Sequence, residues 1–300
     1  MPAMVLGRFA PTPSGRMHLG NMFAFLMAWL GAKAEGGRIL LRMEDLDTLR
    51  CSAEYADLIR GDLEWLGLEW DRETPPQSSR SEAYRAALDS LTERGLTFPC
   101  WCTRGELNIV NAPHASDGHP IYPGTCRGLT EPKPGKAAYR LKVPDEEITF
   151  TDGLCGPYRE NLMRECGDFV LRRADGVFVY QLAVTVDDGE AGVTQVVRGR
   201  DLISSTPRQL YLQRLLGYPP PEYYHLPILT DAEGEKLSKR DRALDMGALR
   251  ERYTPEELTG RLAFAAGLTD REEAVSPAGL IPLFSWDRVT RRETIRISDI

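Results

Sequence analysis

Two short segments of this chain carry side chains suited to holding phosphates, and the first lies near the start. Residues 8–21 read RFAPTPSGRMHLGN, so a loop rich in Pro, Gly and Ser leads into His18, Gly20 and Asn21. Unpaired N–H groups at a helix N-terminus attract phosphate, and His18 and Asn21, three residues apart, share one helical face. Gly20 lacks a side chain where a nucleotide ring could lie against the backbone. Taken alone, these residues are explained equally well by a capped core helix with an isolated histidine.

The second segment, KLSKR at residues 236–240, follows a short polar loop. Lys236 and Lys239, with the hydroxyl of Ser238 between them, can surround a triphosphate with charge and hydrogen-bond donors. In isolation, a solvated basic turn is the simpler explanation. Because both segments occur in this order in one chain, they predict a site that binds ATP and splits it between the α- and β-phosphates.

The elements around the first segment predict how it is positioned. Apolar runs at 5–10 and 38–43 indicate buried strands, and an apolar helix runs between them from residue 18. A strand, a helix and a second strand, with a phosphate loop at the first turn, begin a doubly wound parallel sheet. We therefore expect a Rossmann-type α/β fold in which the second strand delivers Glu44 at its C-terminal end.

Capping and turn signals predict the rest of the chain. The expected elements are a helix over 52–66, a helix opened by a capping box of Ser79 and Glu82, a hairpin of 169–172 with 177–180, a strand over 193–197, a helix capped by Thr206 that reaches 216, and helical structure after 240 up to about 267.

Three of the six cysteines, Cys100, Cys102 and Cys126, cluster in a stretch at 97–136 that lacks periodicity. Cytosolic chains seldom keep disulfides, and a cluster at this spacing indicates a metal rather than free thiols. Zinc favours four tetrahedral ligands, and a thiolate-rich site of this kind is structural. From the chemistry alone, His119 is the first choice for the fourth ligand, and His114 also lies between the cysteines. Such an ion would fold an insertion that has little core of its own.

The composition limits the class of protein. A chain of 300 residues, 42% of them hydrophobic, has room for one large α/β domain with a small appendage. Its net charge of −7 argues against a protein that coats nucleic acid through a basic surface. No stretch is apolar enough to span a bilayer, and no signal peptide is visible. We therefore expect a cytoplasmic protein with no membrane partner, acting as a monomer.

The two phosphate-binding segments resemble the signatures of a known family. His-Leu-Gly-Asn at 18–21 resembles the HIGH motif of class I aminoacyl-tRNA synthetases, and KLSKR at 236–240 resembles their KMSKS motif. Longer strings are similar to the glutamyl/glutaminyl branch, and the resemblance spans roughly residues 5–245. These strings lie at 8–21, 40–47, 197–202 and 229–241.

Two residues depart from the general motifs. Asn21 stands where the first motif ends in histidine, and Arg240 where the second ends in serine. Attack of a carboxylate on the α-phosphate requires charge stabilisation more than proton transfer. An amide donor can supply that stabilisation, so Asn21 is compatible with the chemistry.

The resemblance implies a site for ATP with magnesium and a site for L-glutamate. The implied catalytic residues are His18, Lys236 and Lys239, and the implied ATP contacts are His18, Gly20, Asn21, Ser238 and Lys239. The implied glutamate contacts are Arg8, Phe9, Ala10, Pro11, Thr12, Glu44, Tyr180 and Arg198. Arginine suits the side-chain carboxylate of glutamate, and Glu44 matches the acidic residue that holds its ammonium group.

The resemblance also implies a set of zinc ligands. The family pattern is Cys-x-Cys followed by Tyr-x-x-x-Cys, which this sequence reproduces. It therefore implies zinc on Cys100, Cys102, Tyr122 and Cys126, with Tyr122 in place of a histidine.

The long C-terminal region with which full glutamyl-tRNA synthetases grip the anticodon has no counterpart in this sequence. A catalytic core of this kind resembles the glutamyl-queuosine tRNA(Asp) synthetases, which activate glutamate without tRNA and transfer it to the queuosine base of tRNA(Asp). The alternatives are a truncated glutamyl-tRNA synthetase that charges the acceptor end of tRNA(Glu), a nucleotidyltransferase that shares the first motif, and an inactive paralogue. We expect 1–96 and 141–242 to form the halves of the catalytic domain, 97–140 the zinc-binding insertion, and 243–300 a short, mostly helical region.

Overall fold

A parallel sheet lies at the centre of the computed structural model, which describes residues 4–103, 105–106, 121–131, 133–231, 234–235 and 244–296. Two groups of strands are each parallel: β1 (Leu6–Phe9), β2 (Arg38–Leu41) and β3 (Arg72–Glu73), then β9 (Gln195–Gly199) and β10 (Glu222–Leu226). The groups meet where Thr194 N donates to Leu6 O at 3.0 Å. The α/β fold expected from the sequence is therefore confirmed.

Helix α1 (Leu19–Ala34) crosses from β1 to β2, and its apolar residues fill the main core together with both strands. His18 is its N-cap, so the helix begins at the residue that the motif predicts. The chain must turn tightly at the other end, where a Cβ on Gly37 would lie 2.4 Å from Val5 O. Helix α2 (Ala53–Leu66) follows β2, with Ser52 as its N-cap and left-handed Gly67 as its C-cap, as expected.

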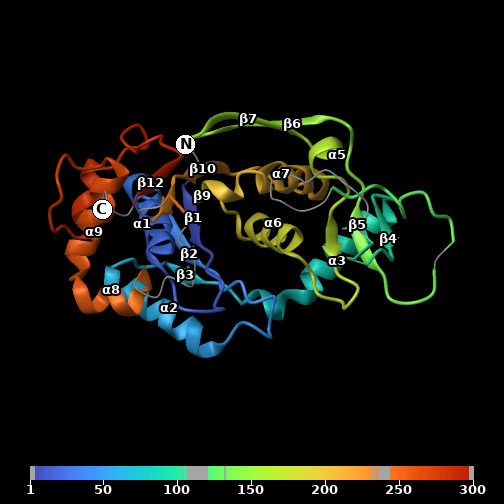
Figure 1. Cartoon of the computed structure of the whole chain (residues 1–300), viewed down its shortest axis with the longest axis horizontal. Helices are drawn as coiled ribbons and strands as arrows, with labels where there is room; N and C mark the ends of the chain where they lie inside the picture. The colour runs from blue at the N-terminus through green and yellow to red at the C-terminus, as the bar shows by residue number, and fades with distance from the viewer. Residues whose placement is uncertain are drawn as a thin grey trace.

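Three helices build the middle of the molecule (Figure 1): α3 (Ser81–Glu93), α6 (Tyr180–Ala191) and α7 (Ser205–Leu216). The predicted capping box of α3 is wrong. Ser79 lies in a 3₁₀ turn, η1 (Gln77–Arg80), and its hydroxyl donates to Pro76 O at 2.8 Å, so it caps no helix. The prediction fails because the turn satisfies that hydroxyl locally.

Two further predictions need correction around α6 and α7. The strand expected over 177–180 is a single bridge between Arg172 and Phe178, and Tyr180 is already the first residue of α6. Thr206 is not a helix cap, because α7 begins at Ser205 and the Thr206 hydroxyl accepts a hydrogen bond from Arg198 Nη2 at 2.8 Å. In both places a contact made by the tertiary structure replaces the local signal.

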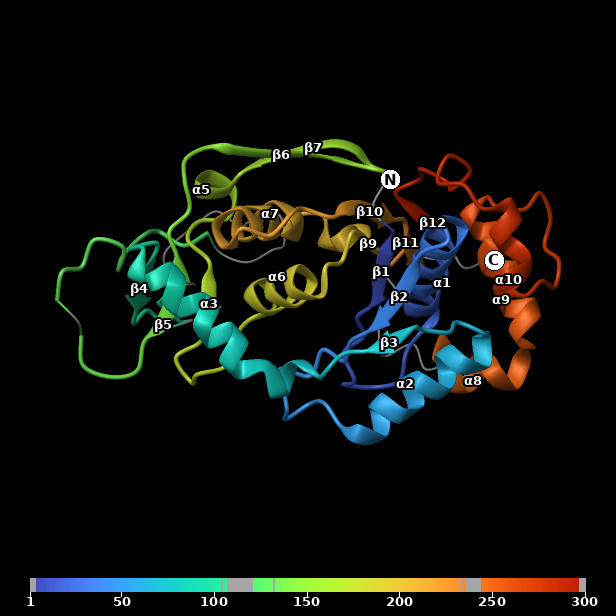
Figure 2. The same ribbon diagram turned by 180° about the vertical axis from the view of Figure 1, so that it is seen from behind.

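The two ends of the molecule are built from different parts of the chain (Figure 2). One end holds the antiparallel strands β4 (Thr97–Cys100), β5 (Ala138–Leu141) and β8 (Val170–Arg172), near α5 (Leu162–Glu165), while the hairpin of β6 (Glu147–Asp152) and β7 (Gly156–Asn161) runs along one side. The other end holds α8 (Met246–Arg252), α9 (Pro255–Ala266), α10 (Pro277–Leu280) and η4 (Ile281–Leu283). The expected helical region ending near 267 thus contains two helices, α8 and α9, and Gly267 is the C-cap of α9.

Strand β12 (Thr294–Arg296) pairs in parallel with β11 (Ile228–Thr230), so the end of the described chain lies beside the strand that precedes the lysine motif. In the part of the chain that the structure describes, no helix has both the length and the apolar character needed to cross a bilayer.

Candidate active site

A cavity of about 520 Å³ opens where the parallel strands end at their carboxyl termini. Ligands of open α/β sheets bind at this edge, because the loops that follow the strands converge there. Many residues singled out from the sequence line this one cavity: Arg8, Ala10, Pro11, Thr12, His18, Gly20, Asn21, Glu44, Tyr180 and Arg198. Among the described residues expected to contact ATP or glutamate, Phe9 is the exception, since it is fully buried and packs against Phe25 with ring centroids 5.2 Å apart.

His18 is oriented by its role as the cap of α1. Its Nδ1 accepts a hydrogen bond from Gly20 N at 3.1 Å, and its backbone N donates to Asn21 Oδ1 at 3.1 Å. Because Nδ1 accepts, a neutral His18 carries its proton on Nε2, which makes that nitrogen a donor. A Cβ on residue 20 would lie 3.1 Å from the His18 ring, so a larger residue than glycine would crowd the imidazole in this position.

The lysine motif itself, with Lys236, Ser238 and Lys239, lies outside the described residues. The described residues on both sides of it are close to the His18 loop. Ile228 and Leu229 line the cavity before the motif. After it, Asp245 forms a β-bridge with His18, and Met246 N donates to Met17 O at 2.9 Å.

Arg198 is a buried arginine on β9 whose guanidinium is held by side chains of three elements. It donates to Tyr180 Oη at 3.2 Å, Gln209 Oε1 at 2.9 Å and Thr206 Oγ1 at 2.8 Å. Its Nε donates to His225 Nε2 at 3.0 Å. The sequence did not single out Gln209 or His225, and both fix the direction of a guanidinium that lines the cavity.

His225 is neutral in this arrangement. Its Nε2 accepts from Arg198, and its Nδ1 lies 2.6 Å from Asp152 Oδ2. Burial lowers the pKa of His225, and the Asp152 carboxylate offsets this only in part. Burial opposes ionisation of Asp152, but the contact with His225 and the hydrogen bonds from the backbone N–H groups of Cys155 and Leu154 together outweigh it and lower the pKa of Asp152. The imidazole of His225 thus lies between the buried Asp152 carboxylate and Arg198, and it fixes the orientation of the guanidinium.

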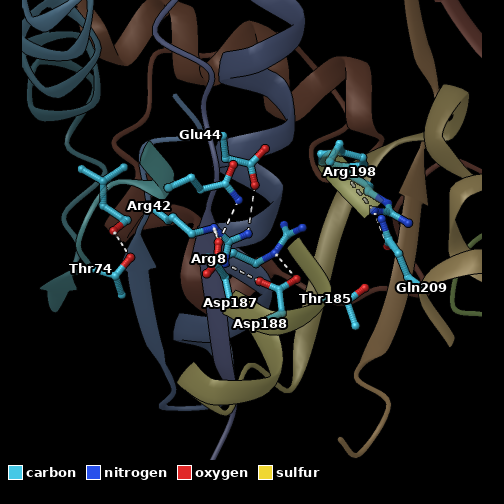
Figure 3. Close-up of polar contacts among 12 residues, drawn as sticks. Arg8, Arg42, Glu44, Thr74, Thr185, Asp187, Asp188, Arg198 and Gln209 are labelled. Atoms are coloured by element: carbon cyan, nitrogen blue, oxygen red, sulfur yellow. Dashed lines mark hydrogen bonds and ion pairs between the residues drawn. The ribbon is translucent and has the colours of Figure 1, made fainter. Parts of the chain in front are cut away.

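A second group of charges surrounds Arg8 and Glu44 (Figure 3). Arg8 Nε donates to Asp188 Oδ2 at 3.4 Å, and Arg42 donates to Asp188 Oδ1 at 2.6 Å and to Glu44 Oε1 at 3.0 Å. Burial raises the pKa of Glu44, although the adjacent Arg42 guanidinium acts against that shift. Neither Arg42 nor Asp188 was singled out from the sequence. The adjacent acids Asp187 and Asp188, which follow an apolar run in the helix, are the sequence signal that could have indicated this cluster.

Cys100, Cys102 and Cys126 form a separate cluster at the β4 end of the molecule. Their sulfur atoms lie within 4.8 Å of one another, and Cys102 Sγ and Cys126 Sγ are 3.6 Å apart. Tetrahedral zinc with Zn–S bonds of about 2.3 Å requires sulfur atoms at about this separation. Tyr122 Oη lies 3.5 Å from Cys100 Sγ and accepts a hydrogen bond from Cys126 N at 2.7 Å. The donor set therefore fits a soft divalent metal, while His114 and His119 lie outside the described residues.

The comparison with protein families agrees with the fold. Residues 4–298 match the family model described as tRNA synthetases class I (E and Q), catalytic domain. The chain belongs to this family, in agreement with the two sequence segments that resemble its motifs.

Curated relatives show to which group within this family the chain belongs. A glutamyl-Q tRNA(Asp) synthetase from Nitratidesulfovibrio vulgaris is 47% identical over 99% of this chain and 97% of its own length. One from Symbiobacterium thermophilum is 48% identical over 98% of this chain and 96% of its own length. The chain is therefore a member of the glutamyl-Q tRNA(Asp) synthetase group.

Among solved structures, the chain is similar to a glutamate tRNA ligase from Elizabethkingia meningosepticum in complex with its amino acid. The TM-score is 0.84 at 28% identity, covering 99% of this chain and 68% of that chain.

Proposed function

We propose that this chain activates L-glutamate with ATP in the absence of RNA and transfers the glutamyl group to the queuosine base of tRNA(Asp). The observation that carries the proposal is one cavity whose lining brings together Arg8, Arg198, Glu44 and the His18 loop. Curated relatives named for glutamyl-Q tRNA(Asp) support the choice of amino acid and acceptor.

In the first step, the α-carboxylate of glutamate attacks the α-phosphorus of ATP, and the bond to pyrophosphate breaks. The product is glutamyl-adenylate. Arg8 and Arg198 hold the side-chain carboxylate and Glu44 holds the ammonium group, so the α-carboxylate is left to react. His18 and Asn21 contact the phosphates, where magnesium accompanies ATP, and Lys236 and Lys239 stabilise the charge that develops on them. In the second step, a hydroxyl of the queuosine base attacks the acyl carbon and AMP leaves.

Exchange of labelled pyrophosphate into ATP tests the first step. We expect exchange when ATP, labelled pyrophosphate and glutamate are present and RNA is left out. Absence of exchange under these conditions would reject the proposal. Exchange that requires tRNA(Glu) would instead favour a glutamyl-tRNA synthetase.

Transfer of labelled glutamate tests the acceptor. We expect labelling of tRNA(Asp) that contains queuosine, and none of tRNA(Asp) that lacks it. Labelling of tRNA(Glu) at its acceptor end would contradict the proposed acceptor while leaving glutamate activation intact.

We also propose that zinc binds Cys100, Cys102, Tyr122 and Cys126 and folds an insertion over residues 97–140. Support comes from the donor set and from the pairing of β4 with β5, which brings the two ends of this segment together. The metal would act as a structural cross-link, because four protein ligands leave it no open position. The halves of the catalytic domain would then be 1–96 and 141–242, followed by a helical region over 243–300.

A further inference from the structure

One buried carboxylate connects the two residues that would hold opposite ends of the substrate. Asp188, on α6, accepts from Arg8 Nε at 3.4 Å through Oδ2 and from Arg42 Nη1 at 2.6 Å through Oδ1 (Figure 3). Arg42 Nη2 in turn donates to Glu44 Oε1 at 3.0 Å. A continuous chain of contacts therefore runs from Arg8 through Asp188 and Arg42 to Glu44.

The middle of this chain lies behind the cavity wall. Arg8 and Glu44 line the cavity, whereas Arg42 and Asp188 do not. Arg42 is 2% exposed and Asp188 6% exposed, so water offers little replacement for a lost contact. Removing one partner from a buried set of charges leaves the others uncompensated, which makes each contact costly to break. The connection is therefore well suited to hold Arg8 and Glu44 at a fixed separation.

That separation has a direct consequence for substrate choice. If Arg8 holds the side-chain carboxylate and Glu44 the ammonium group, the distance between them measures the length of the amino acid. We propose that Asp188 is a positioning residue that fixes the spacing of Arg8 and Glu44 and so makes the site select glutamate over aspartate, which is shorter by one methylene. The inference rests on the proposed activation of glutamate.

The neighbouring residue provides a matched control. Asp187 is also a buried aspartate of α6, 4% exposed. It hydrogen-bonds with Arg80 Nε at 2.6 Å, Tyr84 Oη at 2.9 Å and Gln77 Nε2 at 2.8 Å, and none of these residues lines the cavity. Its ion pair with Arg42 Nε, at 3.7 Å, is longer than the 2.6 Å contact of Asp188 with Arg42. Asp187→Asn therefore makes the same chemical change in the same helix without touching Arg8.

The test compares glutamate with aspartate in pyrophosphate exchange for the wild type, Asp188→Asn and Asp187→Asn. In Asp188→Asn we expect the ratio of kcat/KM for glutamate over aspartate to fall at least about tenfold, since one methylene is typically worth about 10–200-fold in such discrimination. The KM for glutamate should rise while the KM for ATP stays near the wild-type value. Asp187→Asn should keep the wild-type ratio, and thermal unfolding shows whether each variant is folded.

Arg42→Lys serves as a second variant in case Asp188→Asn does not fold. A single ammonium keeps the charge but cannot reproduce the fork that joins Asp188 and Glu44, so the ratio should fall here too. An unchanged ratio in folded Asp188→Asn or Arg42→Lys, or an equal fall in Asp187→Asn, would overturn the inference alone. Absence of glutamate-dependent exchange in the wild type would reject the proposed function and, with it, this inference.

Discussion

At the scale of single residues, the orientation of Arg198 depends on the protonation state of His225. Its Nε2 can accept the hydrogen bond from Arg198 Nε only while that nitrogen is unprotonated. Because burial lowers the pKa of His225, the imidazole stays neutral in the folded protein at pH values where it would begin to take up a proton in the unfolded chain. Arg198 therefore keeps its orientation at neutral pH.

The lowered pKa predicts how stability depends on pH. As the pH falls below about 6.5, the unfolded chain binds a proton at this histidine before the folded protein does, so the free energy of unfolding decreases. The contribution of Asp152, whose pKa is also lowered, is lost only in more acid solution, as the pH falls from about its ordinary value of 3.8 through the folded-state pKa. We expect His225→Gln to flatten the decrease between pH 7 and pH 5.5, measured by urea unfolding. Parallel pH curves for wild type and variant would contradict this role.

How far the site could be predicted differs from one residue to the next. Arg8, Glu44, Tyr180 and Arg198, which line the cavity, were singled out from the sequence through its resemblance to a family. His225 and Asp188 were not found, because their importance comes from partners distant in sequence, as in the contact of Arg8 with Asp188 across 180 positions. The adjacent acids Asp187 and Asp188 could have indicated a charged cluster, but no local pattern shows which distant residues are its partners.

At the scale of helices and strands, two helical glycines show that the same residue type can affect stability in opposite ways. Gly61 of α2 has nothing within 4 Å of the position of a Cβ, whereas a Cβ on Gly260 of α9 would lie 1.8 Å from Glu273 O. The first glycine only weakens its helix, while the second allows α9 to pack against the backbone of the following segment.

These two positions give opposite predictions for the same substitution. Gly61→Ala should raise the free energy of unfolding by roughly 0.5–1 kcal/mol, because alanine is the better helix former. Gly260→Ala should lower it by about 1–3 kcal/mol or more, because the backbone must shift to admit the methyl group. Denaturant unfolding of both variants provides the measurement, and stabilisation by Gly260→Ala would show that the segment at Glu273 yields without cost.

The same contrast explains which elements could be predicted. Helices α1 and α2 were predicted because their caps and apolar faces agree with their tertiary positions. The start of α6 was misassigned because Val177–Val179–Tyr180 has the β-branched and aromatic character of a strand. Packing of α6 against α7 and α3 decides the outcome there, and that information is not local.

At the scale of the whole molecule, the cysteine cluster and the cavity lie in different regions. The cysteines gather near β4 and β5, at the end of the molecule opposite α8 and α9 (Figure 2). The cavity is lined instead by residues of β1 and β9 and by Glu44, which follows β2. Cys100, Cys126 and Tyr122 share a small core of their own with Phe98. A cross-link in that core would stabilise its own end of the molecule more than the site.

Removing the metal should therefore lower the stability of the protein and leave glutamate binding nearly unchanged. We expect elemental analysis to find one zinc ion per chain, and Cys126→Ser to lose it. The variant should unfold at a lower temperature, because metal binding contributes to folding free energy, while the KM for glutamate changes little. Cys166→Ser, at a buried cysteine outside the cluster, is the control. Equal zinc content in wild type and Cys126→Ser would contradict the proposed ligand set.

Helix α6 supplies both Tyr180, at the cavity, and Asp188, about two turns further along. Each residue of an α-helix advances the chain by about 1.5 Å and turns it by about 100°. One residue inserted or deleted between them would swing the carboxylate to another side of the helix while the phenol kept its place. The number of residues in this stretch, more than their identity, is therefore what an enzyme built in this way must preserve, and an engineered insertion there would be harmful even though it touches no ligand.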